Sequence, residues 1–137
     1  MVRIALFQSQ TGIDPAANAA RVVEAIEAAA SAGAAMLFTP EMSGLLDRNS
    51  ERAAANIRAE EEDQVLAASR DAARAKGIWV HLGSVAVLTE GDRLANRSFV
   101  IDPRGEIRAR YDKIHLFDVD LPTGESWRES SVYRHGH

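Results

Sequence analysis

The chain has 137 residues, of which 46% are hydrophobic and 26% charged, a composition typical of one soluble globular domain. Its net charge of −4 excludes the basic surface of a nucleic-acid-binding protein, and no apolar run approaches the roughly 20 residues that span a bilayer. The sequence contains no cysteine, which excludes disulfides, zinc–thiolate sites and thiol nucleophiles within it. We expect a cytoplasmic protein that binds neither nucleic acid nor membranes.

The first forty residues have the pattern of a strand, a helix and a second strand. Residues 2–8 alternate and favour a strand, and Asp14-Pro15 is typical of a helix start. Helical spacing of apolar residues continues to Gly33, a plausible helix end. The apolar run 35–39 then predicts a buried strand. This order indicates a parallel βαβ unit.

The next region, rich in Ala, Arg and Glu, predicts helix from Asn49 through Lys76, with a break near the acidic run 60–63. Gly77 would end this helix. Helical spacing identifies the inner face of its second part as Val65, Leu66, Ser69, Ala72 and Ala73.

A meander of strands follows, and Gly83 is a candidate bulge or bend within its first strand. Turn signals at 90–92 and 102–105 separate the remaining strands. The expected strands are residues 78–88, 95–101 and 106–111. After Phe117 no strong strand or helix pattern is present. The expected core aromatic residues are Trp79, Phe99 and Phe117.

Glu41 follows the strand 35–39 directly, within Thr39-Pro40-Glu41. Open α/β sheets bind ligands at the carboxyl ends of their strands, and Pro40 stiffens the loop. A partly buried carboxylate has a raised pKa, which suits a general base. The alternative is an exposed loop acid, and the position by itself favours that alternative.

Lys113 is one of only two lysines beside 14 arginines; the other is Lys76, near a helix end. An ammonium group at a strand end can stabilise an oxyanion. The alternative is a solvated lysine at the end of a strand. The residues alone leave both interpretations open.

The segment that follows Lys113 contains His115, Asp118 and Asp120, which could form a metal cluster. On a strand, however, the two aspartates share a face and His115 lies opposite. We favour a hydrogen-bonding structural histidine and acids that cap or pair with arginines. Further on, Glu125 and Glu129 would share a face in a helix or belong to a surface turn.

Five segments resemble the nitrilase, or carbon–nitrogen hydrolase, superfamily, and they occur in the family's order along the entire chain. They are VRIALFQSQ, LFTPEMS, GSVAVL, LANRSFVIDPRGEIRARYDKIHLFDVD and ESWRESSVYRHG. Within the superfamily the sequence is most similar to Nit-type amidases, the group of ω-amidase and deaminated glutathione amidase.

The resemblance implies an α/β fold: the N-terminal half of an αββα four-layer, nitrilase-like sandwich, with a mixed sheet and helices on one face. It also implies a Glu–Lys–Cys site. Glu41 matches the general base, and Lys113 matches the lysine that stabilises the tetrahedral intermediate. Glu129 matches the second glutamate, for which Glu125 is the weaker match.

The implied reaction is hydrolysis of a small linear amide to a carboxylate and ammonia through a thioester acyl-enzyme. The resemblance implies no metal and no organic cofactor. It implies a homodimer or higher homo-oligomer, assembled through the outer helices, when the protein is of full length.

The sequence departs from the family at the nucleophile. The family cysteine follows the second glutamate in a segment similar to G-x-x-I-C-Y-D, and this sequence ends at His137 before such a segment. We expect residues 1–137 to be an incomplete carbon–nitrogen hydrolase domain, inactive alone, with apolar sheet surface uncovered. The alternative is a truncated paralogue acting as a non-enzymatic binding module. A metal-dependent hydrolase ranks last.

Overall fold

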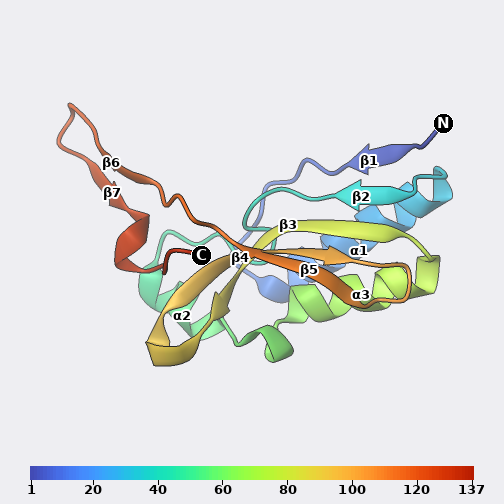
Figure 1. Ribbon diagram of the computed structural model, residues 1–137. Helices are drawn as coiled ribbons and strands as arrows, with labels where there is room; N and C mark the ends of the chain where they lie inside the picture. Colours follow the sequence, from blue (N-terminus) through green and yellow to red (C-terminus); the bar gives the residue numbers. More distant parts are fainter.

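Five strands form a mixed sheet in chain order in the computed structural model of residues 1–137 (Figure 1). They are β1 (Ile4–Leu6), β2 (Met36–Phe38), β3 (Trp79–Leu88), β4 (Leu94–Ile101) and β5 (Ile107–Asp112). Strands β1, β2 and β3 pair in parallel, whereas β4 pairs antiparallel with both β3 and β5. The predicted parallel βαβ unit and the meander after it are therefore confirmed.

The helices α1 (Pro15–Ser31) and α3 (Gln64–Lys76) cover one face of the sheet, and α2 (Ser50–Asn56) lies at the end of the molecule near the C-terminus (Figure 1). The helical region predicted for 49–76 is interrupted after Asn56, and a short 3₁₀ helix, Glu60–Glu62, lies at the predicted break near 60–63. The division arises because Asp63 starts a new helix: its side chain accepts a hydrogen bond from the Leu66 N–H.

The core lies between α1, α3 and the sheet. Helix α3 buries the five residues that helical spacing predicts for its inner face, and helix α1 adds Val22, Ile26 and Ala29. The sheet contributes alternate residues, among them Val80, Leu82, Phe99 and Ile101, which are fully buried.

The opposite face of the sheet carries exposed apolar side chains. Strand alternation places Ile4, Leu6, Trp79 and Tyr111 there, and these side chains are between 39% and 74% exposed. This agrees with the expectation of uncovered apolar sheet surface. The prediction that Trp79 is a core residue is wrong, because Trp79 points away from the face on which its neighbour Val80 is buried.

The segment after β5 contains regular structure that the sequence did not predict. A hairpin of β6 (Asp118–Asp120) and β7 (Ser126–Arg128) projects from the body, and a 3₁₀ turn (Glu129–Ser131) follows it (Figure 1). Each strand has only three residues, too few for alternation to stand out in the sequence, and Asp120 pairs with Arg128 across the hairpin. Phe117, at its base, is 61% exposed, so its prediction as a core residue is wrong.

No helix in the structure is both long enough and apolar enough to cross a membrane.

Candidate active site

The loop that carries Glu41 is fixed to β3. The Gly83 N–H donates to Thr39 Oγ1 at 3.0 Å, and the Met42 N–H donates to Ser84 Oγ at 2.9 Å. A Cβ atom on Gly83 would lie 2.3 Å from the Thr39 carbonyl oxygen, so only glycine permits this approach. The ladder between β3 and β4 shifts register here, as the predicted bulge requires. Met42 itself has a φ of 54°, an uncommon conformation for a residue with a side chain.

Lys113 follows the last residue of β5, and its backbone is held on both sides. Its N–H donates to the Asn96 carbonyl at 2.9 Å, and its carbonyl accepts from the Gly136 N–H at 3.0 Å. The side chain places Nζ 2.9 Å from Glu41 Oε1 and 3.0 Å from Glu129 Oε2. The structure thus brings together the three predicted site residues from three separate parts of the chain.

Glu129 comes from the 3₁₀ turn after the hairpin, and its position is fixed independently of Lys113. Its Oε2 accepts a hydrogen bond of 2.5 Å from the Phe117 N–H at the base of the hairpin. Glu125, by contrast, is exposed in the hairpin turn and makes no side-chain hydrogen bond. Of the two glutamates that the sequence offered, Glu129 is the one that contacts Lys113.

Asn96 is a member of this cluster that the sequence analysis missed. It lies on β4 with 2% of its surface exposed, and its Nδ2 lies 2.8 Å from Glu41 Oε1 and 3.4 Å from Glu129 Oε1. The available signal was an uncharged amide side chain within a predicted strand. A buried amide without a partner is costly, so such a residue requires polar neighbours.

The charges in the cluster stabilise one another. The hydrogen bond from Lys113 lowers the pKa of Glu41 despite partial burial, so the expectation of a raised pKa is wrong. Burial disfavours the Lys113 charge, but hydrogen bonds with Glu41 and Glu129 outweigh it and raise the pKa of Lys113. Burial, with the two carboxylates nearby, raises the pKa of Tyr133 to about 12. Near neutral pH, Glu41 is therefore ionised and Lys113 is protonated.

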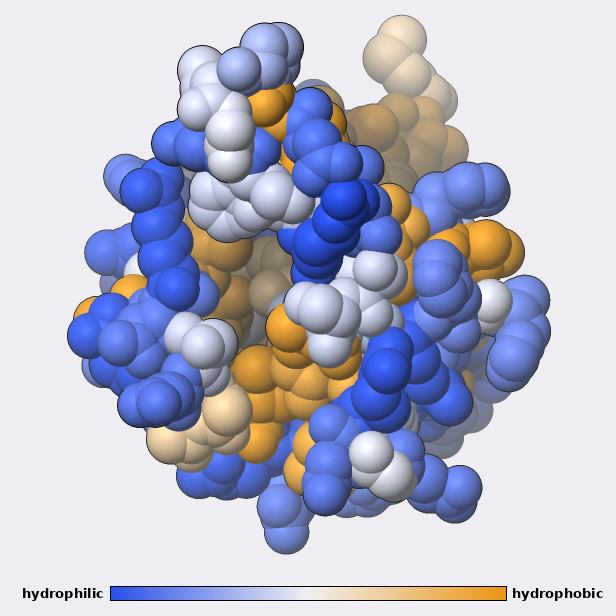
Figure 2. Space-filling view, turned by 90° about the vertical axis from the view of Figure 1, so that its left-hand side faces the viewer, coloured by the Kyte–Doolittle hydropathy of each residue, from blue (hydrophilic) through white to orange (hydrophobic).

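A cavity of about 570 Å³ opens beside the cluster, between α2, the Glu41 loop and the hairpin. Figure 2, viewed from this end of the molecule, shows apolar residues gathered around a hollow with hydrophilic residues at its rim. Apolar lining residues include Leu45, Ala53, Ile57, Phe117, Trp127 and Val132. Glu41, Lys113 and Glu129 line the same cavity, which thus combines a charged end with apolar walls.

The metal-site alternative gains no support from the arrangement of its residues. His115 is exposed and makes no side-chain hydrogen bond, so the structural role expected for it is wrong as well. Asp118 accepts hydrogen bonds from the backbone and hydroxyl of Ser130, and Asp120 pairs with Arg128. These acids cap and pair as predicted. Nowhere do three or more histidine, aspartate or glutamate side chains come together as a metal-binding group.

Comparison with known sequences gives a family match along nearly the whole chain. The family profile described as carbon-nitrogen hydrolase matches residues 3–137. A deaminated glutathione amidase from Yersinia enterocolitica is 32% identical over 136 residues, which cover 97% of this chain and 47% of that protein. The chain therefore spans about half the length of this curated relative.

Solved structures share the fold. The NitFhit protein of Caenorhabditis elegans superposes with a TM-score of 0.85 at 27% identity, covering 100% of this chain and 34% of that one. A mutant amidase from Nesterenkonia sp. AN1, with acrylamide added at its active-site cysteine, gives a TM-score of 0.80 at 26% identity. That match covers 100% of this chain and 50% of the amidase.

Proposed function

Since this chain belongs to the carbon–nitrogen hydrolase family, we propose that residues 1–137 form the N-terminal half of an amidase domain and carry the Glu–Lys part of a Glu–Lys–Cys site. The observation that carries the proposal is the contact of the Lys113 ammonium with Glu41 at 2.9 Å and with Glu129 at 3.0 Å, at one end of a cavity. The nucleophilic cysteine belongs to the other half of the full-length protein.

In the proposed reaction the cysteine thiol gives its proton to the ionised Glu41 carboxylate, and the sulfur attacks the amide carbon. A carbon–sulfur bond forms, and the carbonyl electrons move onto oxygen. Lys113 donates a hydrogen bond to this oxyanion, which is the charge that develops in the transition state. Because Lys113 is already held by two carboxylates, it need not reorganise during the step.

The tetrahedral intermediate collapses when the Glu41 carboxyl returns the proton to the leaving nitrogen. Ammonia departs, and a thioester remains. Glu41 then takes a proton from a water molecule that attacks the thioester and returns it to the departing sulfur, which regenerates the thiol; the carboxylic acid product gives its own proton to the released ammonia and leaves as the carboxylate. Each half of the cycle uses Glu41 once as base and once as acid, so protons balance.

Glu129 and Asn96 have supporting roles in this proposal. Glu129 accepts a hydrogen bond from the Lys113 ammonium, and Asn96 Nδ2 donates to the Glu41 carboxylate oxygen. Both contacts fix the two reacting groups relative to each other. Misplacement of reacting groups by about 1 Å can cost roughly 100-fold in rate, so such support is functionally significant.

The proposed substrate is a small linear amide. The cavity volume of about 570 Å³ and its apolar walls suit such a molecule, with the amide at the charged end. The relatives named deaminated glutathione amidase and the amidase that reacted with acrylamide support the same class. We further propose that the full-length protein is a homodimer assembled through its outer helices.

One experiment tests the proposal directly. We expect the full-length protein to hydrolyse small amides such as α-ketoglutaramate, with release of ammonia, and residues 1–137 alone to show no turnover. Ammonia release by the isolated 137-residue chain would show that the nucleophile is not a cysteine outside residues 1–137. A full-length protein that binds such amides without hydrolysing them would favour a binding module instead.

A further inference from the structure

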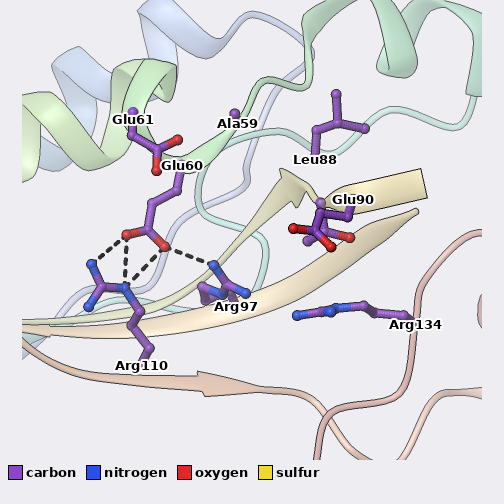
Figure 3. A pocket seen from close by; sticks show the side chains of 9 residues that line it. Ala59, Glu60, Glu61, Leu88, Glu90, Arg97, Arg110 and Arg134 are labelled. Carbon is purple, nitrogen blue, oxygen red and sulfur yellow. Dashed lines mark hydrogen bonds and ion pairs between the residues drawn. The ribbon is translucent and has the colours of Figure 1, made fainter. Parts of the chain in front are cut away.

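A network of ion pairs lies on the helix-facing side of β4 and β5, behind the cluster described above. Arg97 binds Asp112 through two hydrogen bonds, of 2.6 and 3.0 Å, and reaches Glu60 at 2.9 Å. Arg110 binds the same Glu60, as Figure 3 shows. Arg134, from the C-terminal segment, donates to Asp112 at 2.9 Å. Charges of opposite sign thus alternate along five side chains.

The centre of this network is largely withdrawn from water. The side chains of Arg97, Asp112 and Glu60 are 17%, 15% and 14% exposed. Two parallel hydrogen bonds between a guanidinium and a carboxylate also fix the orientation of both groups. Removal of one partner from such a pair leaves a partly buried charge uncompensated, which is strongly destabilising locally.

The network and the proposed active site use adjacent residues of the same strands. Arg97 follows Asn96 on β4, and Asp112 precedes Lys113 at the end of β5. Neighbouring residues of a strand point to opposite faces. Arg97 and Asp112 are direct cross-strand partners, and the next backbone bond joins the Lys113 N–H to the Asn96 carbonyl. From the opposite face of the sheet, the bidentate pair therefore fixes the β4–β5 register that brings Asn96 and Lys113 together.

The segment that carries Glu129 is tied to the same point. The Arg134 N–H donates to the Leu94 carbonyl at 2.8 Å, and its guanidinium binds Asp112. Two residues later, the Gly136 N–H donates to the Lys113 carbonyl, so close that a Cβ on Gly136 would lie 2.1 Å from the Asp112 carbonyl oxygen. Asp112 thus joins three of the backbone segments on which the site depends.

We propose that Arg97 and Asp112 are positioning residues of the amidase site: their ion pair holds Lys113 against Glu41 and Glu129 from the opposite face of the sheet. This inference rests on the proposed function, because the contact it explains is the contact assigned to catalysis. It assigns no chemistry to the pair itself. Arg110 shares Glu60 with Arg97 but has no neighbour in the site, so it provides a matched control.

The test uses the full-length protein with Arg97→Met, Asp112→Asn and Arg110→Met, and follows both turnover and the pKa of Lys113 by NMR of labelled lysine. We expect Arg97→Met and Asp112→Asn to lower kcat roughly 10- to 100-fold with little change in KM, as misplacement of a reacting group does. Arg110→Met should leave kcat within about twofold of wild type.

The direction of the Lys113 pKa separates positioning from simple charge effects. Removal of the Arg97 cation would, by Coulomb interaction alone, raise the pKa of a nearby lysine. Loss of the contacts with Glu41 and Glu129 lowers it instead. We expect a lower Lys113 pKa in Arg97→Met and an unchanged value in Arg110→Met. A raised or unchanged value in Arg97→Met would overturn the proposal.

Two further outcomes are distinguishable. If the wild-type protein shows no amide hydrolysis, the proposed function fails, and the lysine titration still decides whether the pair positions Lys113. If Arg97→Met does not fold, Arg97→Lys keeps the charge but loses the two-pronged geometry. In that variant a normal kcat with a lowered melting temperature would reduce the pair to a purely structural role.

Discussion

The side-chain amide of Asn96 donates a hydrogen bond to Glu41 across 2.8 Å, from a strand position that is almost completely buried. The same nitrogen lies 3.4 Å from Glu129. The Asn96 amide, a neutral donor, therefore lies close to both the Glu41 and the Glu129 carboxylates, which also share the Lys113 ammonium. The amide contributes to the lowered pKa of Glu41, after the larger contribution of Lys113.

Asn96→Asp should disturb this arrangement without changing the size of the side chain. A third carboxylate in the cluster, next to Glu41 and Glu129, would raise the pKa of Glu41, because like charges disfavour ionisation. A base with a raised pKa becomes protonated at higher pH. We therefore expect the acidic limb of the profile of kcat/KM against pH to shift to higher pH. An acidic limb at the wild-type position, in a folded variant, would argue against an interaction between Asn96 and the base. Asn96→Ala, which adds no charge, is the control for packing.

Glu41→Gln should remove the proposed general base while keeping a similar shape. General acid–base catalysis contributes typically 10²- to 10⁴-fold, so we expect kcat of the full-length protein to fall by roughly that factor. Lys113 retains Glu129, and the fold should be preserved. Glu125→Gln is the matched control, because Glu125 is exposed in the hairpin turn; an equal loss in both variants would contradict the assignment.

Lys113→Met should remove the proposed oxyanion donor. Loss of one such donor typically costs 10²- to 10³-fold in kcat, and we expect a decrease of that order. The substitution also leaves Glu41 and Glu129 without their shared cation, so the pKa of Glu41 should rise. Lys76→Met, on a surface helix, is the control. Retention of most of the activity in Lys113→Met would exclude the lysine from the chemistry.

The sequence predicted the main elements of the fold because their signals are local. The inner face of α3 follows from helical spacing, and the bulge near Gly83 follows from a glycine within a strand. Glu41 and Lys113 were found through their strand-end positions together with the family resemblance. The contact between them was not predictable from spacing, since 72 residues separate them.

The features that the sequence did not predict have a common physical cause, which is stabilisation by side-chain contacts between separate segments. The strands of the β6–β7 hairpin have only three residues each, and the pairing of Asp120 with Arg128 helps to hold them together. Asn96 was overlooked because a strand pattern records that a position is buried, but not which polar partner it meets. The lowered pKa of Glu41 likewise depends on Lys113, which only the folded chain brings near.

Acid should destabilise the protein through two paired carboxylates. Hydrogen bonds from Lys113 and Arg97 lower the pKa of Glu41 and Asp112, respectively, below the unfolded values of about 4. Their stabilisation is fully present above the unfolded pKa and is lost as pH falls through the folded pKa. Burial raises the pKa of Asp63, which acts in the opposite direction. We expect urea midpoints to fall below about pH 4; a flat profile between pH 3 and 7 would contradict this.

Gly83→Ala should damage the site from the far side of the Glu41 loop. The added Cβ would lie 2.3 Å from the Thr39 carbonyl oxygen and 2.4 Å from that of Pro40, both backbone atoms that cannot rotate away. Overpacking of this kind costs roughly 1–3 kcal/mol, and relief requires the loop to move. Because Glu41 follows Pro40 directly, that movement should displace the base from Lys113. We therefore expect both a lower urea midpoint and a lower kcat.

Gly12→Ala provides the comparison for this last variant. The nearest atom to a Cβ at Gly12 is the Asn18 side-chain oxygen at 3.4 Å, an ordinary contact, and its φ lies outside the left-handed region. Both substitutions add one methyl group, at Gly83 within β3 and at Gly12 in the loop before α1. If Gly83→Ala loses activity while Gly12→Ala does not, the close approach of β3 to the loop is what fixes Glu41. Equal and small effects would show that the loop adapts and that its attachment to β3 is not required for catalysis.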